Sequence, residues 1–413
     1  MWLLWLLACN PLKSTGDSAT PVAAEGRTYH GDVAPILRTH CEGCHQESGV
    51  GGFSLTTYDD VRLIGDAVLD AVVSRRMPPF LADNSGECQT YVDASWLTED
   101  EIRTLQDWHG EGMEEGSPDE AASLDDSDTG LLTGVTHTLS VDAYDADFSE
   151  RPDDYRCFVV DPGLGEEGFL TGFQALPSNP EIAHHLVIFA PADDAAVSDL
   201  LVLDEGEAGP GYGCFGGPGV AASVVATWGP GRAVSEFPEG SGVRLQPSRP
   251  LIVQMHYSDA GDAPSDATTI DLRVETEVEH ELTTWFFSNN DLVLPPLESS
   301  IEEVMSASAG EFIEHDGSLE IFAILPHMHK LGTSINVQVD REDGTSECVV
   351  DISRWDFNWQ MTYILNDPVY LGAGDQIRLS CSYDTSTVDQ TTYFGDGSSD
   401  EMCLLGMYTV LSD

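Results

Sequence analysis

The sequence predicts a multidomain protein in which a small all-α domain precedes two all-β, jelly-roll-like sandwich domains. Two observations predict this order. Up to about residue 115, apolar residues recur at helical spacing. Beyond residue 130 they form short runs between glycine- and proline-rich turns, which is typical of strands. At 413 residues the chain is long enough for two or three domains.

Residues 1–26 predict an export leader and a tether. The apolar run MWLLWLLAC ends at Cys9 and is far shorter than the roughly 20 residues that a membrane-spanning helix needs. It is similar to a bacterial lipoprotein signal, in which the cysteine is lipidated after cleavage. Since no Lys or Arg precedes the run, a plain export signal is the alternative. We expect a periplasmic or cell-surface protein, lipid-anchored to a bacterial membrane through Cys9.

The charge balance limits the partners of this protein. Acidic residues number 72 against 17 basic ones, which gives a formal net charge of −55. Repulsion from phosphate excludes nucleic acid as a partner. Carboxylates spread along the whole chain indicate a solvated surface that favours a basic partner.

Residues 27–115 carry the helical signals. Residues 63–73 repeat apolar residues at helical spacing. Thr98 and Glu101 form a capping-box pattern, and an apolar stripe at three-residue steps follows it as far as Trp108. This layout predicts a small all-α domain.

An acidic linker and two β-domains follow. Residues 116–132 have almost no apolar content and are rich in Asp, Ser and Gly, as a solvated linker is. Residues 133–290 and 291–413 hold the strand signals, with a break near 289–296. Runs such as 251–255 predict β-sandwiches.

The segment CEGCH has the spacing that attaches and ligates a c-type haem. Cys41 and Cys44 can reach the two vinyl groups of one porphyrin, and His45 can bind the iron. A zinc half-site is the alternative, but zinc usually needs a second paired cluster, and none follows nearby. Met77, on a Met-Pro-Pro corner, is the expected sixth ligand, and Met113 is the alternative. This corner resembles that of single-haem cytochrome c domains.

Histidine clusters in the β-domains indicate further metal sites. His327 and His329 stand two apart, so on a strand they share one face and can bind one ion. His184 and His185 are adjacent and need a bulge or twist to converge, and His256 lies in a further strand. No role is assigned to His30, His40, His109, His137, His280 and His315.

On these residues and on the segment SSDEMC around Met402, residues 133–413 resemble the copper type II ascorbate-dependent monooxygenases. This is the family of peptidylglycine α-hydroxylating and dopamine β-monooxygenases, here preceded by a c-type cytochrome domain. The resemblance implies two copper ions, one in each sandwich, across a solvent-filled gap. The implied ligands are His184, His185 and His256 for the electron-transfer copper, and His327, His329 and Met402 for the oxygen-binding copper.

Apart from the leader cysteine and the two haem thiols, six cysteines remain. An even number is compatible with disulfides in an oxidising compartment, but six thiols allow about fifteen pairings. The resemblance implies the pairs Cys157–Cys214 and Cys381–Cys403. Cys88 and Cys348 then either bridge the haem domain to the second sandwich or stay as separate thiols.

The implied function is hydroxylation of a C–H bond with O₂ at His327, His329 and Met402. Ascorbate or a redox protein would supply electrons, relayed through the haem. In the peptide-amidating enzymes an arginine and a tyrosine hold the substrate carboxylate, and here Leu325 and Gly406 occupy these positions. We therefore expect a neutral or cationic organic substrate. The alternatives are a non-catalytic copper-haem electron carrier or sensor, and a lipid-anchored binding module with structural metals.

Overall fold

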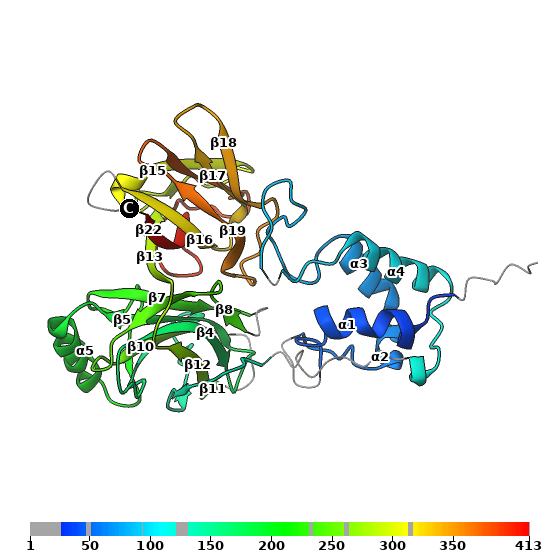
Figure 1. The fold of residues 1–413 in the computed structure, drawn as a ribbon, viewed down its shortest axis with the longest axis horizontal. Helices are drawn as coiled ribbons and strands as arrows, with labels where there is room; N and C mark the ends of the chain where they lie inside the picture. Colours follow the sequence, from blue (N-terminus) through cyan, green and yellow to red (C-terminus); the bar gives the residue numbers. More distant parts are fainter. Residues whose placement is uncertain are drawn as a thin grey trace, which may run out of the picture.

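The computed structural model describes residues 26–46, 51–92, 94–120, 131–230, 234–259, 264–312 and 317–412. Within these ranges a helical unit lies beside two sheet-rich units (Figure 1). Most of the described chain outside the helical unit is β-structure, as the sequence predicted. The leader with Cys9, most of the acidic linker and His315 lie outside the described residues. None of the helices in these ranges has the length and apolar character needed to cross a bilayer.

The helical unit packs four α-helices and a π-helical turn around an apolar core. The side chain of Thr98 caps α4 and Glu101 completes the capping box, so this prediction is confirmed. The stripe that ends at Trp108 is buried. The helical stretch expected over 63–73 is divided between two helices that meet at Ile64. The elements are η1 Tyr29–Val33, α1 Ala34–His40, α2 Tyr58–Leu63, α3 Gly65–Val73, α4 Glu99–Gly110 and η2 Pro118–Glu120.

The first β-unit has two sheets packed face to face. Strands β1, β12, β4 and β9, with β8 beside β4, form one layer, and β6, β3, β10, β5 and β7 form the other. Apolar side chains such as Leu186, Val253 and Leu272 fill the space between the layers. The elements are β1 His137–Ser140, β2 Tyr144–Asp145, β3 Asp153–Val160, β4 Gly168–Leu176, β5 Ala183–Pro191, α5 Asp194–Gly206, β6 Tyr212–Gly213, β7 Ala222–Trp228, β8 Ser235–Glu236, β9 Ser241–Leu245, β10 Leu251–Ser258, β11 Ser265–Asp266 and β12 Thr269–Glu275.

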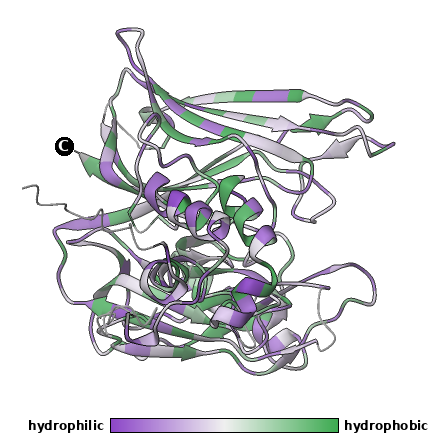
Figure 2. Cartoon of the chain, turned by 90° about the vertical axis from the view of Figure 1, so that its right-hand side faces the viewer, coloured by the Kyte–Doolittle hydropathy of each residue, from purple (hydrophilic) through white to green (hydrophobic). Residues whose placement is uncertain are grey.

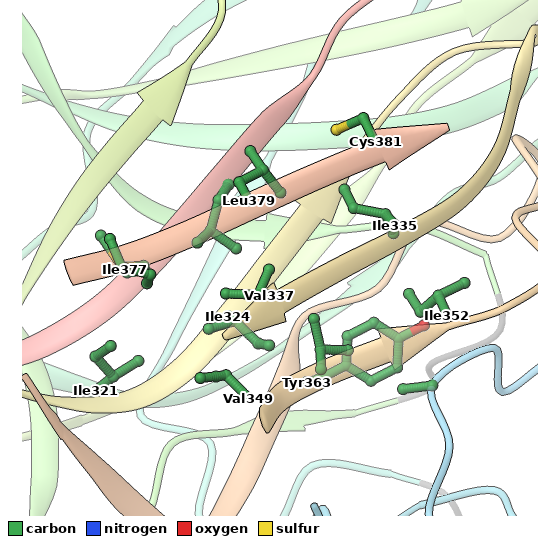
Figure 3. Close-up of a cluster of buried hydrophobic side chains, with 14 of the residues drawn as sticks. Ile321, Ile324, Ile335, Val337, Val349, Ile352, Tyr363, Ile377, Leu379 and Cys381 are labelled. Carbon is green, nitrogen blue, oxygen red and sulfur yellow. The ribbon is translucent and has the colours of Figure 1, made fainter. Parts of the chain in front are cut away.

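The second β-unit repeats this two-layer plan. Strands β13, β22, β16 and β19 face β15, β20, β17 and β18. Ile321, Val337 and Leu379 meet in its core (Figure 3). The elements are β13 His280–Ser288, β14 Val293–Leu294, β15 Ile301–Ser308, η4 Ala309–Glu311, β16 Ser318–His327, β17 Gly332–Asp340, β18 Ser346–Ile352, β19 Tyr363–Leu371, β20 Gln376–Tyr383, β21 Thr392–Tyr393 and β22 Leu404–Ser412.

The two β-units share one sheet. Strand β13 pairs in parallel with β9 of the first unit and antiparallel with β22 of the second. The resulting nine-stranded sheet runs from β1 to β19. Because backbone hydrogen bonds cross the boundary, the units are joined more firmly than a linker would join them.

One helix was not predicted beyond the linker. Helix α5 connects β5 to β6, and the side chain of Asp193 caps it by accepting from the backbone N–H of Ala196. Its buried residues are Ala196 and Leu200, whereas Leu201 and Val202 are exposed. Since apolar residues lie on both faces, the helix has no apolar stripe for the sequence pattern to reveal.

The segment between α3 and α4 packs on the second β-unit rather than within the helical unit. Phe80 and Tyr91 belong to the core of the second β-unit. Cys88 forms a disulfide with Cys348 of β18, which decides the pairing that the sequence left open. In Figure 2 the helices accordingly lie in front of the region between the two β-units.

Candidate metal centres

Strand pairing assembles the first histidine cluster. Strands β5 and β10 are antiparallel neighbours, and His185 lies opposite His256 in their register. The register shifts directly after His256, and this irregularity lets His184 turn toward the same point. The Nδ1 atom of His185 lies 3.2 Å from Nδ1 of His184 and 3.3 Å from Nδ1 of His256.

These separations fit the coordination of one metal ion. Metal–nitrogen bonds of about 2.0–2.1 Å at tetrahedral angles place two ligand nitrogens roughly 3.3 Å apart. The ligand atoms of His184, His185 and His256 all lie within 4.8 Å of one another. Imidazole nitrogens suit copper in particular. The geometry therefore fits the donor set that the sequence suggested.

The environment keeps these imidazoles neutral, which is the form that binds metals. Burial lowers the pKa of His184 to about 3. Burial, together with the neighbouring histidines, holds the pKa of His185 well below its usual value. Burial also lowers the pKa of His256, although the carboxylate of Asp153 opposes the shift.

Asp153 orients the third ligand of this cluster. Its Oδ1 lies 2.9 Å from Nε2 of His256. A carboxylate only accepts, so Nε2 donates and Nδ1 is left for a metal. The hydroxyl of Ser398, from the second β-unit, donates to Oδ2 at 2.7 Å. Burial acts to raise the pKa of Asp153, but the hydrogen bonds from His256 and Ser398 outweigh it and keep that pKa below its usual range.

The second cluster is built from two separate loops. His327 ends β16, and its ring centroid lies 5.0 Å from that of His329. Met402 comes shortly before β22 and lines the same cavity as both histidines. The Nδ1 atom of His329 lies 3.1 Å from the carbonyl oxygen of Asp400 and donates to it, which leaves Nε2 free for a metal.

Glu401 ties the two loops together and was not singled out from the sequence. Its Oε2 accepts from the backbone N–H of His329 at 2.9 Å and of Met402 at 3.0 Å. Its Oε1 accepts from the N–H of Leu331 at 2.7 Å. The side chain is fully buried, and burial raises its pKa to about 7 in spite of these bonds. The sequence did carry one signal for a buried role of Glu401. It is a carboxylate directly before the candidate ligand Met402, in a segment that ends in apolar residues.

Disulfides hold the strands around both clusters. The structure contains the bonds Cys157–Cys214 and Cys381–Cys403, the two pairs that the resemblance implied. Cys403 directly follows Met402, and the hydroxyl of Tyr383 donates to the carbonyl of Met402 at 2.9 Å. The backbone around Met402 is therefore fixed on both sides.

One cavity of about 380 Å³ is lined by His185 of the first cluster and by His327, His329 and Met402 of the second. The ring centroids of His185 and His327 are 6.5 Å apart, so the gap implied by the resemblance is narrow here. The bond from Ser398 to Asp153 crosses between the β-units, as does a bond from the hydroxyl of Tyr155 to the carbonyl of Asp396 at 3.1 Å. These contacts hold the two clusters close together.

The helical unit contains a second cavity, of about 340 Å³. The free thiols of Cys41 and Cys44, the imidazole of His45 and the thioether of Met77 all face it. Met113, the alternative to Met77, instead packs in the helical core. The remaining lining is largely apolar and includes Phe53, Leu55, Ile64, Val68, Ala71, Val72, Pro78, Pro79 and Trp359.

These donors and this lining fit a covalently attached haem. A porphyrin needs a flat apolar space with two thiols at one edge and axial ligands above and below the iron. Burial lowers the pKa of His45, which favours the neutral ring that binds iron. The backbone approaches this ring closely at Gly51, where a Cβ atom would lie 2.3 Å from Nδ1 of His45.

Three other histidines lie near acidic side chains, in the pairs His30–Glu115, His40–Glu101 and His109–Asp66.

The two-layer β-structure thus places two donor clusters, each of a composition that fits a metal ion, next to one another. Residues 284–409 match the family model of the copper type II ascorbate-dependent monooxygenase, C-terminal domain. This part of the chain is therefore related to copper-dependent monooxygenases, in agreement with the sequence resemblance.

Curated proteins of the same kind match a longer stretch. Peptidyl-glycine alpha-amidating monooxygenase A of Xenopus laevis is 23% identical over 61% of this chain and 26% of its own length. DBH-like monooxygenase protein 2 of Mus musculus is 24% identical over 61% and 42%, respectively. Dopamine beta-hydroxylase of Canis lupus familiaris is 25% identical over 45% and 31%. The matched region therefore spans less than half the length of each of these three relatives.

Proposed function

We propose that this protein is an exported, copper- and haem-dependent monooxygenase that hydroxylates a C–H bond of an organic substrate with O₂. The observation that carries this proposal is the convergence of two donor clusters, of different composition, on one cavity. A carrier of single electrons needs only one such cluster. The relationship of residues 284–409 to copper-dependent monooxygenases supports the same conclusion.

The two clusters would hold one copper ion each. His184, His185 and His256 offer three imidazoles, which suit both copper oxidation states. His327, His329 and Met402 add a thioether, which favours Cu(I), the state that reacts with O₂. When bound, the copper ions supply one-electron redox chemistry and O₂ activation. The protein orients the imidazoles through Asp153, Asp400 and Glu401 and keeps them unprotonated.

The cavity supports a neutral or cationic substrate. Its apolar wall includes Phe189, Trp228 and Phe286. Neither Arg nor Lys is among the described residues that line it, whereas the carboxyl group of Asp396 is. A substrate carboxylate would find no charged partner there, which agrees with Leu325 and Gly406 replacing the carboxylate-binding residues of the peptide-amidating enzymes.

The helical unit would hold one haem c. Cys41 and Cys44 would form the thioether bonds, and His45 and Met77 would be the axial ligands. The haem would relay electrons from ascorbate or a redox protein to the copper at His184, His185 and His256. Fusion in one chain and the disulfide between Cys88 and Cys348 support this relay, because they hold the two cavities in one assembly.

Export is part of the proposal. Three disulfides agree with an oxidising compartment. Lipidation of Cys9 would attach the protein to a bacterial membrane from the outside. Mass spectrometry of the protein purified from membranes would show a lipidated N-terminal Cys9, and a Cys9→Ser variant would appear in the soluble fraction.

The deciding experiment measures O₂ uptake by the copper-loaded, reduced protein. We expect two copper ions and one haem per chain, and O₂ consumption that neutral or amine substrates stimulate and carboxylate substrates do not. Product analysis with ¹⁸O₂ would show one labelled oxygen atom in the product. Metal binding without substrate-stimulated uptake would contradict catalysis and indicate an electron carrier or sensor. If His45→Ala left turnover with a protein electron donor unchanged, the relay would be wrong.

A further inference from the structure

A single turn of the second β-unit borders both cavities. The turn comprises residues 355–361 and connects β18 to β19. The side chain of Trp359 lines the cavity of Cys41, Cys44 and His45. The next residue, Gln360, lines the cavity of the two histidine clusters. One peptide bond therefore separates the wall of one cavity from the wall of the other.

The copper-facing side of this turn contacts both histidine clusters. Gln360 lines the same cavity as His327, and the ring of Phe357 has its centroid 5.8 Å from that of His329. The ring of Phe357 stacks on His184 with centroids 4.6 Å apart and planes inclined by 23°. Both clusters thus touch the same short segment.

The turn is held in place from several directions. The N–H of Trp359 donates to the carbonyl of Asp356 at 3.0 Å, and the amide of Gln360 donates to the carbonyl of Phe357 at 2.9 Å. The backbone of Gly229, in the first β-unit, approaches so closely that a Cβ atom there would lie 2.5 Å from the carbonyl oxygen of Gln360. Such a fixed turn keeps its contacts to both cavities at constant distance.

A disulfide and side-chain hydrogen bonds fix the segment that follows α3 to β18 and to the residues just before this turn. Besides the Cys88–Cys348 disulfide, the hydroxyl of Tyr91 donates to the carbonyl of Val349 at 3.0 Å. The guanidinium of Arg354, just before the turn, donates to the carbonyl of Arg75 at 3.0 Å. Arg75 lies two residues before Met77, so this bond holds the Met77 corner close to the turn.

We propose that the turn of residues 355–361 is the electron-transfer junction between the haem and the copper of His184, His185 and His256, with Trp359 as its haem-facing group and Gln360 and Phe357, which stacks on His184, as its copper-facing groups. This inference rests on the proposed function, since it requires haem in one cavity and copper in the other. In the loaded protein the transfer would move one electron from the haem iron to a copper ion, oxidising iron(II) to iron(III) and reducing copper(II) to copper(I). No bond forms or breaks and no proton moves. Ascorbate or an exported redox protein returns iron(III) to iron(II).

The test compares Trp359→Leu with a matched control, Trp96→Phe. Trp96 packs against the second β-unit, where the guanidinium of Arg75 lies 4.1 Å from its ring, but it lines neither of the two cavities. The full-length protein is loaded with both metals, its haem is reduced without reducing copper, and haem oxidation is followed by stopped-flow absorbance without O₂. We expect at least ~10-fold slower haem oxidation in Trp359→Leu and an unchanged rate in Trp96→Phe.

Haem and copper content, the haem spectrum and the haem reduction potential are measured in each variant. If Trp359→Leu retains all four properties and oxidises its haem at the wild-type rate, the proposal that this turn is the electron-transfer junction is contradicted. If the wild-type protein binds no haem, or oxidises it without regard to copper, the proposed function itself fails instead.

A second variant decides the matter should Trp359→Leu lose its haem. Phe357→Leu keeps an apolar side chain, removes the ring that stacks on His184 and leaves the lining of the haem cavity intact. With copper content unchanged, slower haem oxidation in this variant supports the junction, and a wild-type rate overturns it.

Discussion

The two histidine clusters are assembled by different means. In the first cluster, strand pairing sets the positions, since His185 and His256 face each other across neighbouring strands. The Nδ1 atom of His185 lies 3.2 Å from that of His184 and 3.3 Å from that of His256. In the second cluster, His329 and Met402 lie 73 residues apart along the chain, on loops that Glu401 joins. A sheet provides convergence in the first case and a buried carboxylate provides it in the second.

The two clusters should therefore respond differently to substitution of the residues that position them. The first cluster lies on β5 and β10, two inner strands of the five-stranded sheet, so a change in one side chain leaves its backbone in place. The second cluster depends on three hydrogen bonds to a single side chain. Positioning residues should therefore matter more at the second cluster than at the first.

The largest effect should follow removal of a ligand from either cluster. His185→Ala and His327→Ala should each lower the copper content from two ions to one and reduce turnover by about 1000-fold, or roughly 4 kcal/mol in activation free energy. Metal analysis and O₂ uptake measure the two effects. His137→Ala is the control, because His137 lies on β1, away from both clusters. Two bound copper ions in either ligand variant would contradict the ligand assignment.

The next effect should come from Glu401→Gln. Glutamine offers one acceptor oxygen to three backbone donors, so at least one of the N–H groups of His329, Leu331 and Met402 loses its partner. We expect copper affinity at the second cluster to fall by about 10- to 100-fold, with the first cluster unaffected. Titration with Cu(I) under a competing chelator distinguishes the two sites. An equal loss of copper affinity at both clusters would show that Glu401 stabilises the fold as a whole rather than positioning the second cluster.

A smaller effect should follow Asp153→Asn. The amide oxygen can still accept from Nε2 of His256, but the negative charge is lost and the second oxygen no longer accepts from Ser398. We expect copper affinity at the first cluster to fall by about tenfold. The same chelator titration measures it, and Asp154→Asn, on the neighbouring residue, is the control. A loss confined to the second cluster would mean that Asp153 acts mainly through Ser398.

Residue types and spacing were enough to predict most donors of the candidate sites. Thiols, imidazoles and thioethers are few, and their spacing reflects geometry that the chemistry requires, as in CEGCH or the His327–His329 pair. The order of a helical unit before two β-units was likewise predictable, because the periodicity of apolar residues changes from helical to strand-like beyond the linker.

The positioning residues were not predictable in the same way. Asp153, Glu401 and Gln360 are common residue types whose roles arise only when distant segments meet. The narrow separation of His185 and His327 depends on contacts between the β-units that no local pattern records. Helix α5 was missed because the apolar residues on both of its faces conceal its periodicity.

The smallest effect should come from Ser398→Ala, which probes the connection between the two clusters. The Ser398 hydroxyl donates to Asp153 at 2.7 Å and accepts from Nζ of Lys330 at 3.0 Å. Its removal takes one hydrogen bond from a carboxylate that keeps its bond to His256, so we expect about fivefold weaker copper binding at the first cluster, or roughly 1 kcal/mol. Ser386→Ala, on the exposed loop after β20, controls for loss of a serine in the same unit. Combining Ser398→Ala with Asp153→Asn should then add little beyond Asp153→Asn alone, because both changes remove the same bond. Fully additive losses would show that the serine acts on the first cluster by another route than Asp153.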